Sequence, residues 1–558
     1  MIKLLDQQTI GQIAAGEVIE RPLSVVKELV ENSIDAGASR VDVRIEEGGL
    51  RSIQVGDDGE GIAAHQLALA LKRHATSKLA AASDLEAIGT LGFRGEGLAS
   101  IAAVSRVRVT SRKNGSDIGS AVEAFGETIG FVEPCSAAPG TIVEARDLFA
   151  NVPVRREYLR SPAAEFRRIS SWLSTFTLAY PGVTFSLMHD GKPVWVLPEV
   201  REPKQRLSAV FGKDAAAHLL PLQSDAARDL SGEVNGFISE PGWDRPDRRL
   251  QVLFVNGRLL RSTLLAGAWN AAYSTFAMTG RNPYGVLFLS LPPDHVDANV
   301  HPTKSDVRLR FGHQVFDAVR RAISTTLRAH SASTFRDAVS LSPNGIDTSL
   351  AHLQTLFEAA PHAEQEPSEY AGARRMRVLG QIAQTYIVAT DGRTLMLIDQ
   401  HAAHERIAYE SIMANAKNSS TAEPLLVPLT FELNGGESEA LERAVPALTE
   451  GGLQIEEFGE RSFRIVTTPG GYGAREFDLR GFLADVTASP GGIDVRERTW
   501  ASLACHSVTR AGERLEPAEM ASLIERLQLC SNPMHCPHGR PTLLRLDEDA
   551  LAKLFKRL

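Results

Sequence analysis

The stretch that decides the fold reads Pro22-Leu-Ser-Val-Val-Lys-Glu28-Leu-Val-Glu-Asn32-Ser-Ile-Asp35-Ala-Gly37. At about 100° per residue, Glu28, Asn32 and Asp35 fall within roughly 60° of arc on one helix face. The opposite side is apolar and makes the helix amphipathic; it carries Val26, Val30 and Ile34. A carboxylate that can take a proton from water, beside an amide oxygen that can hold Mg²⁺, indicates nucleotide hydrolysis. For an isolated helix, a solvated polar face is the alternative interpretation.

The segment after this helix favours the nucleotide interpretation. Residues 41–45 and 53–55 alternate like half-buried strands, and the second leads into Asp57-Asp-Gly-Glu-Gly61. A carboxylate at a strand end can accept a hydrogen bond from the exocyclic amine of adenine, which would select adenine over guanine. The glycines would let the backbone approach a ligand closely. Taken alone, this acidic turn is also compatible with an ordinary tight turn.

A glycine-rich segment comes next. Arg73-His-Ala-Thr76-Ser77-Lys78 precedes Gly89-Thr-Leu-Gly92-Phe93-Arg94-Gly95-Glu96-Gly97-Leu98, which leads into an Ala-rich stretch. A glycine-rich loop that opens a helix presents backbone N–H groups to phosphates, and Lys78 and Arg94 would add positive charge. The chain has no Walker-type Gly-x-x-x-x-Gly-Lys-Ser/Thr segment, so a different set of residues would hold the phosphates.

The order of these parts resembles the GHKL ATPases, the superfamily of gyrase, heat-shock chaperones, histidine kinases and MutL. Five sequence segments are most similar to motifs of the MutL family: 12–22, 73–78, 92–96, 254–258 and 300–304. The resemblance implies an ATP site in which Glu28 is the general base, Asn32 the Mg²⁺ ligand and Asp57 the adenine reader. The other ATP-binding residues that it implies are Thr76, Ser77, Lys78, Gly92, Phe93, Arg94, Gly95, Glu96, Gly97, Thr141 and Lys304. Gly92 to Gly97 would form a lid, and Lys304 would reach the γ-phosphate.

The C-terminal third contains a second group of ligand-type side chains. Asp399-Gln-His401-Ala-Ala-His404-Glu405 leaves a predicted strand and enters a helix, while Ala504-Cys505-His506 and Cys536-Pro-His538-Gly-Arg-Pro541 lie far downstream. Such a set suits a divalent metal, because thiolate and imidazole favour Zn²⁺ and carboxylate admits Mn²⁺. From spacing alone, polar residues at a helix start together with buried structural cysteines are the alternative.

These segments resemble the endonuclease class of MutL. Its Asp-Gln-His-Ala-x-x-Glu-x-x-x-x-Glu motif is complete at 399–410 and its Cys-Pro-His-Gly-Arg-Pro motif at 536–541, whereas His506 stands at a basic position of a third element. The resemblance implies a metal site made of Asp399, His401, Glu405, Cys505, Cys536 and His538, with Asp399 and Glu405 in the catalytic role. It implies a homodimer that nicks the nascent DNA strand and works with MutS. The alternative is an ATP-dependent matchmaker without nuclease activity, whose metal site is structural.

Length and patterning predict a multidomain α+β and α/β chain. A length of 558 residues allows three or four folding units of about 150 residues each. We expect an α/β sandwich at 1–202, followed at 203–330 by a strand–helix–strand order that implies a right-handed crossover. The family resemblance implies that the first is the GHKL ATPase domain and the second a transducer subdomain. A flexible linker at 331–375 has few large apolar residues. An α+β dimerisation and endonuclease domain would follow at 376–558, with an inserted subdomain at 432–492 and a first strand near 381–388.

Composition excludes several classes of protein. Apolar residues make up 43% and charged residues 23% of the chain, as in ordinary globular proteins. Four cysteines in so long a chain favour a reducing cytoplasm. The sequence lacks both a membrane-span pattern and a signal-peptide pattern. A histidine kinase would need a phosphoacceptor helix before residue 22, and a topoisomerase would need further catalytic domains where the linker stands.

Two weaker signals concern partners. Glu423-Pro-Leu-Leu-Val-Pro428 resembles the sliding-clamp motif Gln-x-x-Leu-x-Pro, with Glu423 in place of Gln, although a plain strand would give the same pattern. Arginines that could contact DNA phosphates without reading bases cluster at 155–168, 258–261 and 308–310. The net charge of −8 speaks against a constitutively tight DNA binder but permits a local basic groove.

Overall fold

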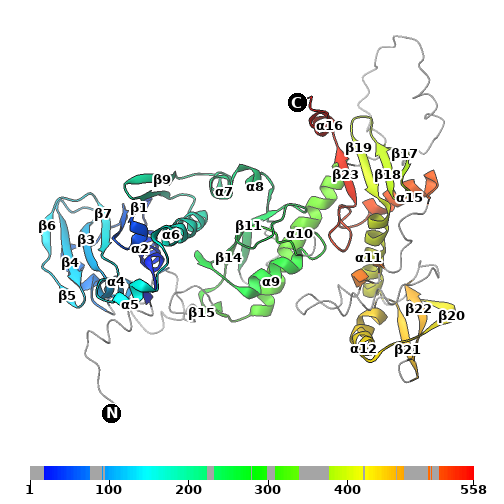
Figure 1. Cartoon of the computed structure of the whole chain (residues 1–558), viewed down its shortest axis with the longest axis horizontal. Coiled ribbons are helices and arrows are strands. Elements are labelled where there is room, and N and C mark those ends of the chain that lie inside the picture. Colours follow the sequence, from blue (N-terminus) through cyan, green and yellow to red (C-terminus); the bar gives the residue numbers. More distant parts are fainter. Residues whose placement is uncertain are drawn as a thin grey trace, which may run out of the picture. The chain divides into compact units, whose positions relative to one another are not determined.

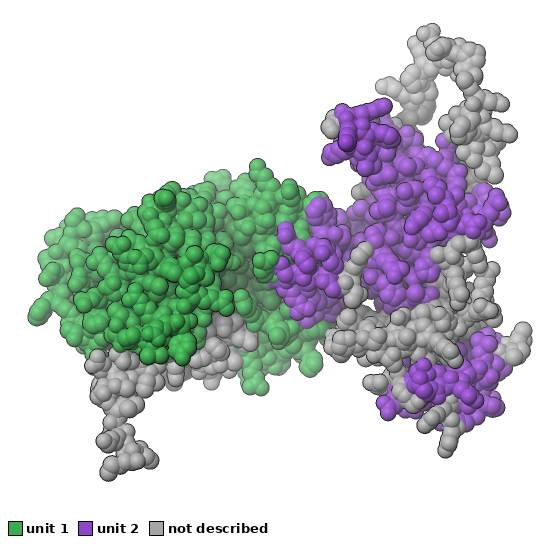
Figure 2. Space-filling view, viewed as in Figure 1, with its two compact units in different colours: residues 1–239, 249–266, 284–319 green, residues 240–248, 267–283, 320–558 purple. Residues whose placement is uncertain are grey.

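The computed structural model describes most of the chain, and Figure 1 shows its elements. The described residues are 18–73, 75, 91, 95–222, 232–277, 280–297, 308–338, 376–418, 422–450, 452–459, 462–469, 500–502, 504–505 and 514–557. Of the predicted site residues, Thr76, Ser77, Lys78, Gly92, Phe93, Arg94 and Lys304 lie outside the described residues, as do His506 and the linker segment 339–375. The chain forms two compact units, coloured in Figure 2: the first comprises 1–239, 249–266 and 284–319, and the second 240–248, 267–283 and 320–558.

The first unit contains a mixed sheet in the order β5-β4-β3-β7-β2-β1-β8-β9, with β6 paired to β4. Its strands are β1 (Arg40–Glu46), β2 (Ser52–Asp57), β3 (Arg106–Arg112), β4 (Gly119–Phe125), β5 (Thr128–Ile129), β6 (Glu133–Cys135), β7 (Gly140–Arg146), β8 (Thr184–His189) and β9 (Lys192–Leu197). Its helices are α2 (Pro22–Asp35), α3 (Ala64–Ala70), α4 (Gly97–Val104), α5 (Pro153–Glu157) and α6 (Pro162–Phe176), with 3-10 turns η1 (Glu47–Gly49) and η3 (Thr177–Ala179). Burial alternates along β1, β2 and β3, so one sheet face packs against helices.

Helix α2 begins with a proline in its first turn and ends at Asp35, two residues before Gly37. Its buried face is formed by Val25, Val26, Leu29 and Val30, whereas Ile34 is only half-buried. Asp58, which follows β2 directly, holds the start of β1. Its Oδ1 accepts hydrogen bonds from the amides of Ser39 and Arg40, each at 2.8 Å.

A second sheet in this unit has the order β10-β11-β14-β12-β13. Its strands are β10 (Leu219–Pro221), β11 (Glu233–Ser239), β12 (Gln251–Val255), β13 (Arg258–Leu260) and β14 (Gly285–Ser290), and β15 (Val296–Asp297) pairs with β16 (Arg308–Leu309). Its helical neighbours in sequence are α7 (Pro203–Phe211), α8 (Lys213–Ala217), α9 (Thr263–Ala272), η5 (Pro293–His295) and α10 (Gly312–Ala338). β12 and β14 are parallel with α9 between them in the chain, the pairing that a crossover connection requires. Helix α10 continues to Ala338, past the predicted linker boundary at 330.

The second unit contains two antiparallel sheets. One has the order β17-β18-β19-β23 and the other β20-β22-β21. The strands are β17 (Arg377–Ile382), β18 (Tyr386–Thr390), β19 (Leu395–Asp399), β20 (Ala422–Glu432), β21 (Gln454–Gly459), β22 (Ser462–Pro469) and β23 (Leu543–Leu546). The helices are α11 (Gln400–Asn418), α12 (Gly435–Glu450), α15 (Pro517–Gln528) and α16 (Glu548–Leu554). Together the parts confirm a multidomain α+β chain.

Helix α11 belongs to both cores of this unit (Figure 1). Ala403 and Ile407 pack in the core of the β17–β23 sheet with α15. Ala408, Tyr409 and Ile412 pack in the core of the β20–β22 sheet with α12. One helix therefore supplies apolar side chains to two cores while its first two turns carry the predicted metal ligands His401 and Glu405.

The prediction of a single strand at 381–388 was wrong. That segment ends β17 at Ile382 and starts β18 at Tyr386, and the turn between them holds Ala383 and Gln384 at φ of 50° and 52°. Two positive φ angles in succession are typical of a type I′ hairpin turn, which usually carries Gly, Asn or Asp. Ala and Gln give no such signal, so the sequence pattern does not show this turn.

No helix among the described residues is long and apolar enough to cross a membrane.

Candidate functional site

Two polar residues of α2 contact other segments of the first unit. Asp35 Oδ1 accepts the Leu91 amide at 3.0 Å, which ties the helix to the residue before the predicted lid. A Cβ added at Gly97 would lie 2.9 Å from Glu28 Oε2, so the Glu28 carboxylate lies against the start of α4. Asn32, one turn after Glu28, is half-buried. The predicted base and the end of the predicted lid, including Gly95 and Glu96, thus lie at neighbouring points of the fold.

Asp57 ends β2 and is held by three donors. Its Oδ1 accepts the amides of Gly59 and Thr141, at 3.0 and 3.2 Å, and its Oδ2 accepts the Ser33 hydroxyl at 2.8 Å. Burial raises the pKa of the Asp57 carboxyl, although these three hydrogen bonds oppose that rise. Ser33 escaped the sequence reasoning, since a serine beside Asn32 carries no signal until the register of β2 is known.

Thr141 lies opposite Asp57 in the β2–β7 pairing. Its hydroxyl is 2.9 Å from the Ser111 hydroxyl, which also accepts the Ile62 amide at 2.7 Å. Ser111 is a second residue that sequence reasoning missed. These contacts fix the wall behind Asp57.

Gly140 allows the start of β7 to approach the backbone of Asp57 closely. It has φ +109°, and a Cβ there would lie 2.0 Å from the Asp57 carbonyl oxygen. A side chain at this position would therefore clash with the backbone of Asp57, and residue 140 itself would have a strained backbone conformation. This glycine is needed for the position of Asp57.

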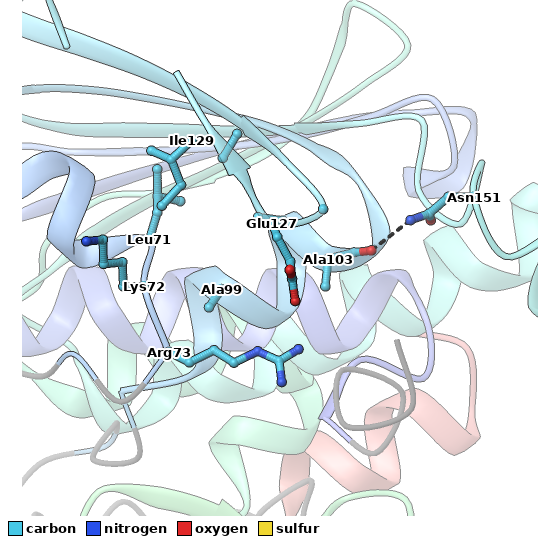
Figure 3. Close-up of a pocket in the computed structure, with 11 residues that line it drawn as sticks. Leu71, Lys72, Arg73, Ala99, Ala103, Glu127, Ile129 and Asn151 are labelled. Atoms are coloured by element: carbon cyan, nitrogen blue, oxygen red, sulfur yellow. Dashed lines mark hydrogen bonds between the residues drawn. The ribbon is translucent and has the colours of Figure 1, made fainter. Parts of the chain in front are cut away.

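A cavity of about 250 Å³ lies elsewhere on this sheet, beside α4 (Figure 3). One wall is fixed by Asn151, whose Nδ2 donates to Ala103 O at 2.8 Å. Its lining, within the described part of the chain, comprises Leu71, Lys72, Arg73, Ala99, Ala102, Ala103, Ala124, Gly126, Glu127, Ile129 and Asn151. That lining contains none of the residues predicted to bind ATP, so the nucleotide prediction does not rest on this cavity.

In the second unit, the predicted metal ligands other than Asp399 converge on Glu405. Glu405 forms one group with His401 and Cys505 and another with Cys536 and His538, and the ligand atoms of each group lie within 4.8 Å of one another. His401 Nε2 is 3.0 Å and the Cys505 thiol 2.9 Å from Glu405 Oε1. His538 Nδ1 lies 3.7 Å from Oε2.

The charges in this cluster are strongly coupled. Burial alone would raise the pKa of Glu405, but its interactions with His401, His538 and Cys505 outweigh burial and hold that pKa well below the usual range. The interactions of His538 with Cys536 and then Glu405 raise the pKa of His538 to about 10. Glu405 Oε2 is buried without a hydrogen-bond partner among the described residues. A carboxylate oxygen left in this state beside thiols and imidazoles fits a divalent cation such as Zn²⁺.

Cys536 and His538 are presented by a tight hairpin. The amide of Gly539 donates to Cys536 O at 3.0 Å, the Cys536 amide donates to Arg540 O at 2.8 Å, and His535 bridges to Pro541. Gly539 has φ +80°. A turn with proline second and a left-handed glycine after it is a common three-residue hairpin loop, which explains the Pro and Gly of the motif.

Asp399 is used differently. It precedes α11, and its Oδ1 accepts the Ala402 amide at 3.0 Å, which is the geometry of a helix N-cap. It lies outside both ligand groups around Glu405. The structure thus assembles the predicted cluster except for this carboxylate.

The predicted arginine clusters differ in exposure. Arg156, Arg160 and Arg167 are exposed, as are Arg308 and Arg310. Arg258 is buried, and although burial lowers its pKa, the charges of Glu31, Asp35 and Glu28 oppose that fall. Arg258 therefore faces the acidic side of α2 and is unsuited to contact DNA.

Comparison with family models gives three matches. Residues 20–123 match the "Histidine kinase-, DNA gyrase B-, and HSP90-like ATPase" family, and residues 207–328 match the "DNA mismatch repair protein, C-terminal domain". Residues 379–515 match the "MutL C terminal dimerisation domain".

Whole-length relatives agree with these matches. A DNA mismatch repair protein MutL of Desulforudis audaxviator is 38% identical, with 100% of this chain and 99% of the relative covered. One of Xanthomonas oryzae pv. oryzae is 36% identical over the same shares. A crystal structure of the N-terminal domain of a DNA repair protein is 26% identical with a TM-score of 0.50, and the match covers 58% of this chain and 99% of that one.

Proposed function

The chain belongs to the MutL family of DNA mismatch repair proteins, and from that membership we propose an ATP-gated dimeric clamp that nicks DNA with a metal-dependent C-terminal site. ATP binding follows from its GHKL ATPase domain, and a homodimer is supported by its C-terminal dimerisation domain. The observation that carries the nuclease proposal is the convergence of thiol, imidazole and carboxylate ligands on Glu405. The domain boundaries predicted at 202, 330 and 375 remain part of this proposal.

In the ATPase site, Glu28 is the proposed general base. Its carboxylate lies at the start of α4, where it would take a proton from the water that attacks the γ-phosphate. Asn32 would hold Mg²⁺ by its amide oxygen. The predicted lid residues would contribute backbone N–H groups to the phosphates.

Asp57 is the proposed adenine reader. An ionised carboxylate offers about four acceptor positions. The two backbone donors use Oδ1 and Ser33 uses one position of Oδ2, which leaves a position on Oδ2 for the exocyclic amine of adenine. Guanine presents a carbonyl there, so adenine would be selected.

In the C-terminal site, Glu405, His401, Cys505, Cys536 and His538 would hold Zn²⁺ or Mn²⁺. A bound divalent cation supplies activation of water and stabilisation of charge on the attacked phosphate. We assign the catalytic role to Glu405 with Asp399. Cys505, Cys536 and His538 suit a regulatory or structural Zn²⁺.

The proposed partners are MutS, DNA and the replication sliding clamp. The exposed arginines of α5, α6 and β16 are candidates for phosphate contacts. Segment 423–428, which resembles the sliding-clamp motif, lies in β20, where the pairing with β22 is interrupted between Pro424 and Leu429. ATP would close the N-terminal halves into a second dimer contact.

The decisive experiment is a plasmid-nicking assay with Mn²⁺ that compares the wild type with Asp399→Asn. Asparagine caps helices about as well as aspartate, so the variant keeps the start of α11 while it removes the charge. Asp391→Asn is the matched control, because Asp391 also accepts backbone amides, those of Arg393 and Thr394, in a turn of the same unit. We expect nicking to be lost only in Asp399→Asn.

The second candidate function is a matchmaker without nuclease activity. It is favoured by the capping contact of Asp399 and by its position outside the ligand groups. Absence of nicking by both the wild type and Asp399→Asn would support this alternative, whereas equal nicking by both would remove the catalytic assignment of Asp399.

A further inference from the structure

One ion pair on α11 lies next to the proposed metal ligands but belongs to neither ligand group. Arg406 follows Glu405 directly, and Glu410 lies one turn further along the helix with its Oε1 3.7 Å from Arg406 Nη1. The Arg406 side chain is 2% exposed and that of Glu410 is 20% exposed. A buried arginine of this kind is tolerated only where its donors are used.

Glu410 binds the chain just before the Cys536 hairpin. Its Oε2 accepts the Ser531 amide at 2.6 Å, and its Oε1 accepts the Asn532 amide and the Ser531 hydroxyl, both at 3.0 Å. Three donors from two consecutive residues therefore converge on one carboxylate. Hydrogen bonds of this charged type are short and strong.

Arg406 binds the same loop four residues further on. Its Nε donates to His535 O at 2.6 Å, and the next residue is Cys536, which is fully buried. At its other end the hairpin is closed by the Thr542 amide, which donates to Met534 O at 2.9 Å. The loop is thus fastened on both sides of the two ligands that it presents.

We infer that Arg406 and Glu410 are positioning residues that set the thiol of Cys536 and the imidazole of His538 against Glu405. Glu405, Arg406 and Glu410 stand on one rigid helix, so the distance between the carboxylate ligand and the hairpin is fixed by α11 itself. Groups that orient metal ligands from behind commonly change metal affinity about 10- to 100-fold when they are removed. This inference rests on the proposed metal site.

The test uses the full chain with Glu410→Gln, which keeps the volume but loses the charge and one acceptor. Co²⁺ titration reports the site through thiolate-to-metal absorption, and we expect about 10- to 100-fold weaker Co²⁺ binding with an altered spectrum. A parallel measurement needs no metal: iodoacetamide labelling of Cys536, located by peptide mass spectrometry, should be at least tenfold faster in metal-free Glu410→Gln. Glu437→Gln is the control, because Glu437 accepts the Asn434 amide at 3.0 Å at the start of α12, and it should match the wild type in both assays.

The outcomes separate this inference from the proposed metal site. If the wild type binds no Co²⁺, the metal proposal fails, and Cys536 labelling still decides whether the pair holds the hairpin. If Glu410→Gln binds Co²⁺ and labels like the wild type, the positioning role is overturned. If circular dichroism shows that Glu410→Gln is unfolded, Ser531→Ala replaces it, since that change removes only the hydroxyl donor to Glu410; unchanged labelling in Ser531→Ala would then overturn the inference.

Discussion

Ser33→Ala tests whether α2 sets the acceptor that would read adenine. The Ser33 hydroxyl lies 2.8 Å from Asp57 Oδ2 and 3.1 Å from Leu29 O. It has one hydrogen, and the carboxylate is the nearer and stronger acceptor. The variant would leave Oδ2 without this donor, while Oδ1 keeps the amides of Gly59 and Thr141.

The magnitude follows from burial and charge. Ser33 is 2% exposed, and a hydrogen bond to a charged group contributes about 1.5–3 kcal/mol. We expect Ser33→Ala to lower the free energy of unfolding by an amount in that range. The KM for ATP should rise roughly tenfold, equivalent to about 1.4 kcal/mol, with kcat unchanged, because the adenine contact is made equally in ground and transition states.

The protonation of Asp57 predicts how ATP affinity changes with pH. Only ionised Asp57 keeps all its acceptor positions, so ATP affinity should fall as the pH falls through the pKa of this carboxyl. Burial already raises that pKa, and the Ser33 hydrogen bond opposes the rise. Without Ser33 the pKa rises further, so Ser33→Ala should lose ATP affinity at a higher pH than the wild type.

Binding of a fluorescent ATP analogue across pH, together with urea unfolding, measures these effects. Ser174→Ala is the matched control, because Ser174 is a helical serine whose hydroxyl donates to Ser171 O at 3.1 Å on the exposed side of α6. A Ser33→Ala protein with reduced stability but wild-type KM at every pH would refute the adenine assignment.

Three further predictions concern the same protein. Glu28→Ala should bind ATP normally and hydrolyse it about 10²–10⁴-fold more slowly in a phosphate-release assay, and unchanged turnover would remove Glu28 as the base. Asn32→Ala should lose the Mg²⁺-dependent part of ATP binding, seen as equal affinity with Mg²⁺ and with a chelator. Gly140→Ala should destabilise the fold far more than Gly37→Ala, for both have positive φ but a Cβ at Gly37 meets nothing within 4 Å whereas one at Gly140 lies 2.0 Å from backbone; comparable urea midpoints would contradict the close approach.

The sequence predicted those parts whose chemistry is local. The amphipathic helix that carries Glu28 and the strand that leads into Asp57 both follow from periodicity. The convergence on Glu405 was predicted only through family resemblance, since Cys505 and Cys536 are distant in sequence and their spacing forms no compact metal motif.

What the sequence could not give depends on tertiary contacts. Ser33 and Ser111 acquire roles only when strands bring Asp57 and Thr141 beside them. Asp399 caps its own helix, a contact that the motif does not show, and its role in the metal site stays a prediction. The turn at Ala383 has unfavourable residues for its positive φ, so the surrounding sheet must impose it.

The sharing of α11 between two cores has a consequence for how the C-terminal region comes apart. Ala403 and Ile407 serve one core and Ala408, Tyr409 and Ile412 the other, so neither sheet can melt without removing packing from the helix that supports the other. We expect amide hydrogen exchange along α11 to report one common opening event for both sheets. If the proposed ligands His401 and Glu405, on the first two turns of this helix, hold a cation, that common opening would also separate them from the rest of the site.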